Sequence, residues 1–388
     1  MFINFFLTII LSWKDFRTTT KEPDYYIPKI PWDAKKSIYY AFESSIGTKC
    51  KITAALEALS FYTCMEAYEA EEIPRGKQGI IFQGCNGDTT TYNANLFSND
   101  FIVRFCITDK CADSYGCTTH YIYRMFGLRP PHIREDRKEH VFVNYSNVKF
   151  PNDNLYFSRY SFDEIPFFDI PYDFGSTAHK DSHYLSKNGL PTLVPEKTLE
   201  FAYMIQPNNY NSPTFNDFKY LHKHQCGDQC RSFKPCKNGG YYLHSCYSCI
   251  CPKPYYGRYC DKIKEQTDKC PSYNFEALDQ KQHVEVGGKV ECNFLLQAPQ
   301  GYKVHVNIIA HKQKHELLDS NCSPTKGVNV RFNKDKGGRD LILCRDIQNV
   351  SVPVVSNEVL IEYNYLFQSS TYLKFSYWRE FDPNDCYY

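Results

Sequence analysis

A single imidazole begins the stretch of this chain whose residue types come closest to catalytic chemistry. Residues 120–137 read HYIYRMFGLRPPHIREDR, with His120 seven positions before Gly127. Two histidines four positions apart on one helix face, with Glu after the first, form a common zinc-hydrolase pair. In that pair the imidazoles bind the metal and the Glu accepts a proton from metal-bound water. Here Tyr121 stands where the Glu belongs, and Arg124 stands where the second His belongs.

These two replacements do not favour zinc chemistry. A phenol loses its proton only near about pH 10, so a tyrosine is a poor general base at neutral pH. Arginine is always charged, and Arg124 lies on the same helix face as His120, so it is predicted to place a cation where a metal would bind. A different interpretation stays open for each residue. For Arg124 it is a solvated helix charge, and for His120 it is a partly buried imidazole satisfied by a hydrogen bond.

The surrounding residues predict the elements that position this stretch. The run Thr118–Phe126 predicts a helix, because Gly127 closes it and the two prolines at 130–131 prevent its continuation. Upstream, Lys51–Glu69 has apolar residues at helical spacing. The runs GIIFQG (79–84) and FIVRFC (101–106) are typical of strands. These elements predict an α+β domain.

Composition limits the classes of function. The 388 residues carry a net charge of +1, which makes nucleic acid an improbable partner. Eighteen cysteines indicate disulfides and an oxidising compartment. The apolar start MFINFFLTIILSW is too short to span a bilayer. It suits a secretory signal at residues 1–16, followed by a short leader at 17–26. The alternatives are a misassigned start and a buried N-terminal strand. Glycosylation is predicted at Asn144 and Asn349, and the protein is predicted to be secreted.

Two further modules follow the first domain. Residues 227–263 contain six cysteines and a Lys-Asn-Gly-Gly stretch and resemble an EGF-like module, which implies the pairs Cys230–Cys246, Cys236–Cys249 and Cys251–Cys260. Residues 264–388 alternate apolar and polar residues in short runs, which indicates a β-sandwich. The segment CNFLLQAPQGYKVHVNI from position 292 resembles CUB domains. That resemblance implies the pairs Cys270–Cys292 and Cys322–Cys344.

The first domain, residues 27–226, resembles the astacins, zinc endopeptidases of the metzincin clan. The resemblance rests on the order and spacing of several pieces, among them ALSFYTC (58–64), YDFGS (172–176), LSKNGLPT (185–192) and Arg134-x-Asp136-Arg137. It implies zinc and peptide hydrolysis, with the signature His-Glu-x-x-His-x-x-Gly-x-x-His.

Aligned on Gly127, this signature leaves His120 as the one retained ligand position and puts Pro130 in the third. Ala178 then replaces the Met of the later turn, and Lys180 replaces the Tyr that can approach the metal. Three other histidines are candidates for a rebuilt zinc site: His132, His179 and His183.

The family resemblance also implies disulfides in the first domain. It pairs Cys64 with Cys226 and Cys85 with Cys111. A Cys106–Cys117 pair is our further guess, and Cys50 and Cys386 are left without an assigned partner.

Three functions are compatible with these observations. The first is a secreted pseudo-protease with no cofactor, whose cleft cations Arg124 and Lys180, beside His179, hold an extracellular peptide or protein. The second is a zinc-dependent endopeptidase with an aberrant site. The third is an adhesion or matrix protein that binds through its EGF-like and CUB-like modules. The sequence identifies neither the partner nor the oligomeric state.

Overall fold

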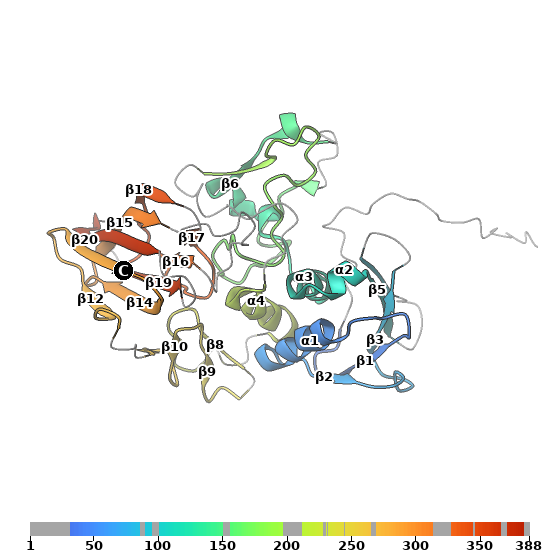
Figure 1. Ribbon diagram of the computed structural model, residues 1–388. Coiled ribbons are helices and arrows are strands. Elements are labelled where there is room, and N and C mark those ends of the chain that lie inside the picture. Colours follow the sequence, from blue (N-terminus) through green and yellow to red (C-terminus); the bar gives the residue numbers. More distant parts are fainter. Residues whose placement is uncertain are drawn as a thin grey trace, which may run out of the picture.

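The computed structural model places three connected parts side by side (Figure 1). A helical and sheet domain comes first, a small disulfide-linked module follows, and a β-sandwich ends the chain. The structure describes residues 32–388 apart from 86–89, 95–100, 150–155, 197–211, 228–229, 231, 244, 265–268, 313–326, 344–345, 366–370 and 384–388. The predicted signal and leader, the predicted Cys322–Cys344 bridge and Cys386 therefore lie outside the described residues.

A five-stranded sheet forms one side of the first domain, in the order β2-β1-β3-β5-β4. Strands β1, β3 and β5 run parallel, and β4 pairs antiparallel with β5 at the edge. Both strands predicted around residues 79 and 101 are confirmed, the second shifted by one residue. The strands are β1 Ile38–Phe42, β2 Ala67–Glu69, β3 Gly79–Gly84, β4 Thr91–Ala94 and β5 Ile102–Ile107.

Helix α1 (Cys50–Tyr62) is shorter than the predicted Lys51–Glu69. The helix ends because Thr63 turns extended, and the next residue, Cys64, is tied to Cys226. The last residues of the predicted helix pair with β1 instead. Tertiary pairing has therefore overridden local helix propensity at this end.

Three more helices complete the domain core. Tyr123 on α3 donates its hydroxyl hydrogen bond to the carbonyl of Ala55, 3.0 Å away, which fixes α3 against α1. Helix α4 starts at a capping box, in which Thr214 and Asp217 satisfy each other's backbone N–H groups. The helices are α2 Asp109–Ala112, α3 Tyr115–Met125 and α4 Phe215–Cys226, with single 3-10 turns at Pro131–Ile133, Glu135–Glu139 and Tyr145–Asn147; strands β6 (Val141–Val143) and β7 (Leu193–Pro195) pair beyond them.

The small module lies between α4 and the sandwich (Figure 1). Its three predicted disulfides, Cys230–Cys246, Cys236–Cys249 and Cys251–Cys260, are all present. Tyr241 donates a 2.7 Å hydrogen bond from its hydroxyl to the carbonyl of Tyr62, which ties the module to the end of α1. Its strands are β8 Tyr241–Tyr242, β9 Cys249–Ile250, β10 Tyr255–Tyr256 and β11 Lys262–Ile263.

The C-terminal part is a two-sheet sandwich, as the alternating pattern predicts. One sheet has the order β12-β14-β19-β16-β17 and the other β13-β20-β15-β18, and the inward residues of both form one apolar core. The predicted Cys270–Cys292 bridge joins the start of this part to β14. The strands are β12 Asn274–Glu276, β13 Gln282–Gly287, β14 Val290–Gln297, β15 Tyr302–Lys312, β16 Gly327–Arg331, β17 Leu341–Leu343, β18 Ile347–Ser351, β19 Glu358–Tyr365 and β20 Tyr372–Phe381.

The disulfides of the first domain correct two expectations. The Cys64–Cys226 bridge is confirmed, but Cys85 pairs with Cys106 and not with Cys111. The reason is sheet register: Gln83 on β3 lies opposite Cys106 on β5, so the next residues of β3 carry Cys85 to within 5.1 Å of Cys106, measured between Cα atoms. Cys111 then pairs with Cys117 across the α2–α3 turn, which rules out the guessed Cys106–Cys117 pair. Cys50 is exposed and unbridged among the described residues.

The loop between β16 and β17 of the sandwich carries a buried carboxylate, Asp340. It accepts hydrogen bonds from the backbone N–H of Asn333 at 2.9 Å and from its side-chain amide at 2.8 Å. Burial raises the pKa of the Asp340 carboxyl from 3.8 to about 6. The folded chain therefore takes up a proton here at a higher pH than the unfolded chain does.

We expect the unfolding free energy of the natural chain to rise relative to that of Asp340→Asn as the pH falls. The cost of the buried charge is present above about pH 6 and is relieved as the pH falls towards 3.8, because only the folded state is protonated in that window. The difference between the two proteins should change by about 2 kcal/mol between neutral pH and pH 4, and by about 3 kcal/mol once the pH is well below 3.8. Urea titrations over this range measure it, and a difference independent of pH would contradict the assignment.

Candidate functional site

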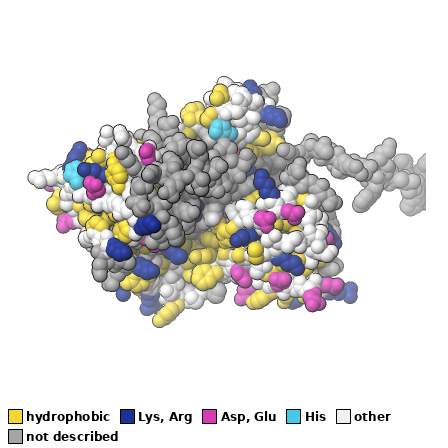
Figure 2. Space-filling view, viewed as in Figure 1, with side chains coloured by type: hydrophobic (Ala, Val, Ile, Leu, Met, Phe, Trp, Pro, Cys, Tyr) yellow, Lys and Arg dark blue, Asp and Glu magenta, His cyan; other side chains and the backbone are white. Residues whose placement is uncertain are grey.

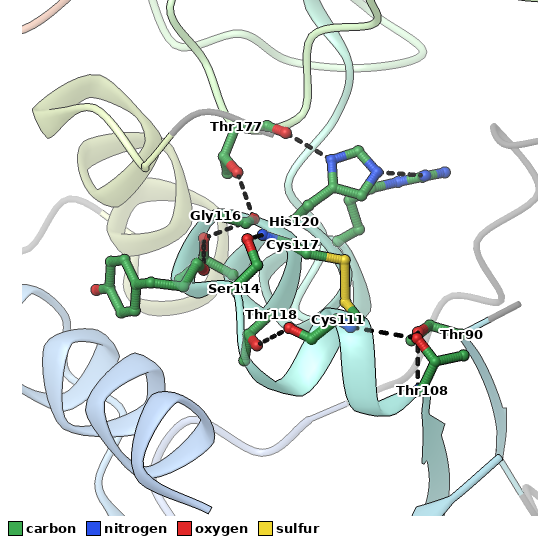
Figure 3. The surroundings of a disulfide bond; sticks show 12 residues. Thr90, Thr108, Cys111, Ser114, Gly116, Cys117, Thr118, His120 and Thr177 are labelled. Carbon is green, nitrogen blue, oxygen red and sulfur yellow. Dashed lines mark hydrogen bonds between the residues drawn. A yellow bond between two sulfur atoms is a disulfide. The ribbon is translucent and has the colours of Figure 1, made fainter. Parts of the chain in front are cut away.

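The candidate site is built around α3, whose two ends are fixed by local chemistry. The Ser114 hydroxyl accepts from the N–H of Cys117 at the start, and the Cys111–Cys117 disulfide holds the same turn (Figure 3). Gly127 ends the helix at a φ of 99°, a conformation that favours glycine. A Cβ at Gly127 would also lie 2.5 Å from Nε2 of His224 on α4, so that side chain would have to move to admit one.

Both ring nitrogens of His120 have partners. Nδ1 lies 2.5 Å from the carbonyl oxygen of Thr177, towards which the ring points in Figure 3. Nε2 lies 3.2 Å from Nη1 of Arg124, one helical turn along α3. A guanidinium can only donate, so Nε2 accepts and the ring proton is on Nδ1, donated to Thr177. His120 is therefore a neutral imidazole whose lone pair faces a cation.

Arg124 is a buried residue, with 5 % of its surface exposed, so the alternative of a solvated helix charge is wrong. His120 is fully buried, and the hydrogen-bonded imidazole considered for it is confirmed. The prediction that Arg124 places a cation where a metal would bind agrees with the structure, because its guanidinium lies against Nε2 of His120.

The other two altered signature positions are Tyr121, on α3 itself, and Pro130, just beyond the helix. The Tyr121 ring is half-buried and lies edge-on to the His120 ring, with 5.1 Å between centroids. Pro130 is in an extended conformation just before the 3-10 turn that contains His132. Its ring nitrogen is part of the backbone, so its side chain can offer nothing to a metal.

The loop at residues 173–178 forms the support beneath His120. Asp217 accepts a 2.6 Å hydrogen bond from the Ser176 hydroxyl and a 2.9 Å bond from the Thr177 N–H. Ala178 fills the position of the family Met and is fully buried. Burial raises the pKa of the Asp217 carboxyl to about 6, with the neighbouring charge of Asp173 adding to the shift. The loop thus presents the Thr177 carbonyl to His120 from a fixed position.

Two of the three histidine candidates, His132 and His179, belong to an aromatic cluster. His179 donates from Nδ1 to the Lys180 carbonyl at 2.7 Å and accepts at Nε2 from the Tyr172 hydroxyl at 2.8 Å. Burial lowers the pKa of the His179 imidazole to about 4, so this ring is neutral at neutral pH. The His132 and His179 ring centroids are 6.1 Å apart, and the Lys180 ammonium lies 5.1 Å from the Tyr184 ring centroid.

His183 makes a 3.0 Å contact between its Nδ1 and the hydroxyl of the neighbouring Ser182. The structure therefore brings His120 and Arg124 together. It collects His132, His179 and Lys180 around aromatic rings.

The retained Arg134-x-Asp136-Arg137 motif has a structural role. The Arg134 guanidinium donates to both Asp136 carboxylate oxygens, at 2.8 and 2.7 Å, and to the carbonyl of Ile170. Arg137 donates to the carbonyls of His132 and Phe157 at 2.8 and 2.6 Å. These bonds hold the loops beyond α3 together.

The residues present do not fit a zinc ion. Metal-binding imidazoles commonly fix one ring nitrogen on a carbonyl or carboxylate and bind the metal with the other. The Thr177 contact leaves Nε2 of His120 for that purpose, and the Arg124 guanidinium lies on it. Within the described ranges, no group of three or more His, Cys, Asp and Glu side chains could hold a metal ion.

Sequence reasoning missed the carboxylates that support the site, Asp173 and Asp217. The Thr214-x-x-Asp217 spacing does match a capping box and was a detectable helix-start signal. Nothing in the sequence indicates that the same Asp217 reaches back to Thr177. The predicted glycosylation sites lie in the described part: Asn349 is exposed on β18, and Asn144 caps a 3-10 turn.

Positive and negative side chains are interspersed over the face shown in Figure 2, in keeping with the small net charge. Of the helices in the described ranges, none has the length and apolar character that a bilayer crossing needs.

Comparison with known proteins gives consistent matches. The model of the family described as Astacin, a peptidase family, matches residues 26–226. The zinc metalloproteinase nas-34 of Caenorhabditis elegans is 22% identical over 85% of this chain and 53% of its own length. The zinc metalloproteinase dpy-31 of the same organism is 25% identical over 81% of this chain and 53% of its own length. This chain thus spans about half the length of the curated relatives it matches.

Among solved structures, a hatching enzyme zinc-protease of the medaka fish, Oryzias latipes, matches with 18% identity and a TM-score of 0.38. That match covers 48% of this chain and 86% of the fish protein.

Proposed function

Because this chain belongs to the astacin family of peptidases, we propose that it is a secreted, non-catalytic family member that binds extracellular peptides or proteins. The family's zinc-dependent hydrolysis sets the expectation, and the residues at the site depart from it. Seven disulfides among the described residues support an oxidising compartment.

The observation that carries this proposal is the contact between Arg124 and His120. The guanidinium occupies the lone pair of the retained imidazole, and its charge is held inside the protein, where solvent screens it little. The positive charge of the guanidinium repels Zn²⁺ and attracts an anion. The same position that would activate water in a zinc peptidase is suited here to hold a carboxylate.

The sheet offers a place for an extended peptide. Strand β4 is an edge strand that pairs with β5 on one side only within the described sheet. An edge strand can add a peptide through backbone hydrogen bonds, while side-chain contacts supply specificity. We propose that a peptide pairs with β4 and that its free carboxylate approaches Arg124, with Lys180 as a second, more exposed cation.

Removing the two cations should weaken peptide binding without creating or abolishing cleavage. We expect Arg124→Ala to lower the affinity for decapeptides with a free C-terminus by about 10- to 100-fold, the usual effect of losing a charged hydrogen bond. Lys180→Ala should have a smaller effect, about 5-fold at most, because its charge is partly solvated. Fluorescence anisotropy with a library of labelled decapeptides, each also made as the C-terminal amide, measures both.

Lys281→Ala is the matched control, since this lysine lies on the sandwich, over the Trp378 ring at 4.5 Å. Equal binding of acid and amide peptides, or wild-type affinity in Arg124→Ala, contradicts the carboxylate site. Loss of binding in the control alone would support the alternative in which the C-terminal modules bind the partner. Chelator-sensitive cleavage of the peptides, with about one zinc per chain, would instead establish the family activity.

A further inference from the structure

The loop between β16 and β17 of the sandwich lies against the support of the candidate site. The backbone N–H of Arg339 donates a 3.0 Å hydrogen bond to Oδ1 of Asp173, and Asn216 at the start of α4 donates 3.2 Å to the Gly337 carbonyl. On the flank of this contact, Lys219 of α4 pairs with Asp335 of the same loop. A segment far away in the sequence is thus bonded to the first domain at several points.

Gly175 allows this approach. A Cβ on Gly175 would lie 2.5 Å from both Cβ and Cδ of Arg339, and 2.8 Å from its Cγ. Carbon atoms in contact are normally about 3.5 to 4.0 Å apart, so the sandwich loop can reach its position only because residue 175 has no side chain. The packing is therefore specific to this pair of residues.

From Arg339 a continuous series of hydrogen bonds leads to the imidazole. Asp173 also accepts from the Gly175 N–H at 2.9 Å and from the Thr214 hydroxyl at 2.7 Å. Thr214 in turn caps α4 together with Asp217, and Asp217 accepts from the N–H of Thr177 at 2.9 Å. Thr177 then supplies the carbonyl that orients His120.

The electrostatics of this region favour the same arrangement. Burial raises the pKa of the Asp173 carboxyl, while the Thr214 and Arg339 hydrogen bonds and the Arg339 charge act in the opposite direction. Two buried carboxylates, Asp173 and Asp217, lie in one region, so withdrawing the Arg339 cation would leave them less compensated. The sandwich loop is thus an electrostatic as well as a steric part of the support.

We propose that Arg339 of the sandwich is a positioning residue for the candidate site: by packing on Gly175 and bonding Asp173, it holds the loop whose Thr177 carbonyl orients His120 against Arg124. The sandwich is then part of the site's framework. The proposal rests on the proposed function only in so far as peptide binding is used as a readout.

The test uses the full chain and the His120 ring itself as the reporter. In the natural protein the ¹⁵N resonances of His120 should show a neutral ring protonated at Nδ1, with slow exchange of that proton. Gly175→Ala should push the Arg339 loop away, speed up exchange of the Nδ1 proton by about tenfold or more, and weaken decapeptide binding by a similar factor. Gly47→Ala is the control, because its new Cβ would meet its nearest neighbour at 3.9 Å.

A compensating variant separates positioning from general damage. Gly175→Ala combined with Arg339→Gly removes the clashing side chain while keeping the backbone N–H that bonds Asp173, so it should restore the His120 signals in part. Recovery should stay incomplete, because the Arg339 charge that compensates Asp173 is missing from the double variant. Wild-type His120 exchange in Gly175→Ala, or no recovery in the double variant, overturns the proposal. If the His120 signals respond as expected but no peptide binds even to the natural chain, the positioning role stands and the proposed function fails.

Discussion

Arg124→His is expected to raise the affinity of this chain for zinc. The substitution removes the guanidinium from Nε2 of His120 and places a second imidazole one helical turn away, on the same face. If four ligands give about 10 kcal/mol, one added ligand contributes roughly 2.5 kcal/mol, close to a 100-fold gain in affinity. Titration with Zn²⁺, followed by isothermal calorimetry and by the shift in Tm, measures the gain.

Arg124→Gln is the control for this experiment. It removes the same positive charge and a similar length of side chain but adds no imidazole, so it should show little gain in zinc affinity. Equal gains in both variants would mean that charge repulsion alone excludes the metal. We expect neither variant to hydrolyse peptides, because Tyr121 remains at the general-base position. A natural chain purified with one tightly bound zinc would contradict our account of the site.

Loss of the Cys64–Cys226 disulfide should have the largest effect on stability. This bridge closes a loop with a sequence separation of 162 residues and joins the end of α1 to the end of α4. A loop of this length corresponds to about 5 kcal/mol of unfolded-state entropy, the upper end of what disulfides contribute. We expect the Cys64→Ala, Cys226→Ala double variant to lose several kcal/mol of unfolding free energy in guanidinium titrations.

The Cys111–Cys117 disulfide provides the matched comparison, with a separation of only 6 residues. Its removal should cost about 2 kcal/mol by the same loop argument. A larger loss from the short loop than from the long one would contradict this ranking. Peptide mapping of the natural chain checks the pairing directly: a fragment joining Cys85 to Cys111 would support the family-based expectation over the observed Cys85–Cys106.

The order of the domains was predictable because each part has its own strong pattern. The α+β elements around α3, the six cysteines of the small module and the alternating runs of the sandwich each carry local information. The contact of Arg124 with His120 was also foreseeable, since both residues lie on one helix and four residues make one turn. Cysteine pairing in the first domain was not, because it depends on the register between β3 and β5.

The support of the site could not be predicted from sequence for a similar reason. Asp173, Asp217 and Arg339 are brought together by three segments, two of which are separated by more than a hundred residues. Neither side-chain periodicity nor local motifs encode such contacts. The burial of Arg124 likewise depends on the loops that cover α3. The helical pattern alone is equally compatible with a buried and with a solvated arginine at this position.

Gly127 illustrates the difference between a position that the fold requires and a position that a reaction requires. Its backbone conformation and its closeness to His224 are demanded by folding, whatever reaction the protein performs. Tyr121 and Pro130 stand where the family signature has Glu and His, yet Tyr121 packs against the domain core and Pro130 is buried. A chain can therefore keep the outline of a peptidase while the residues at these two positions change, so a family likeness identifies the fold before it identifies the reaction.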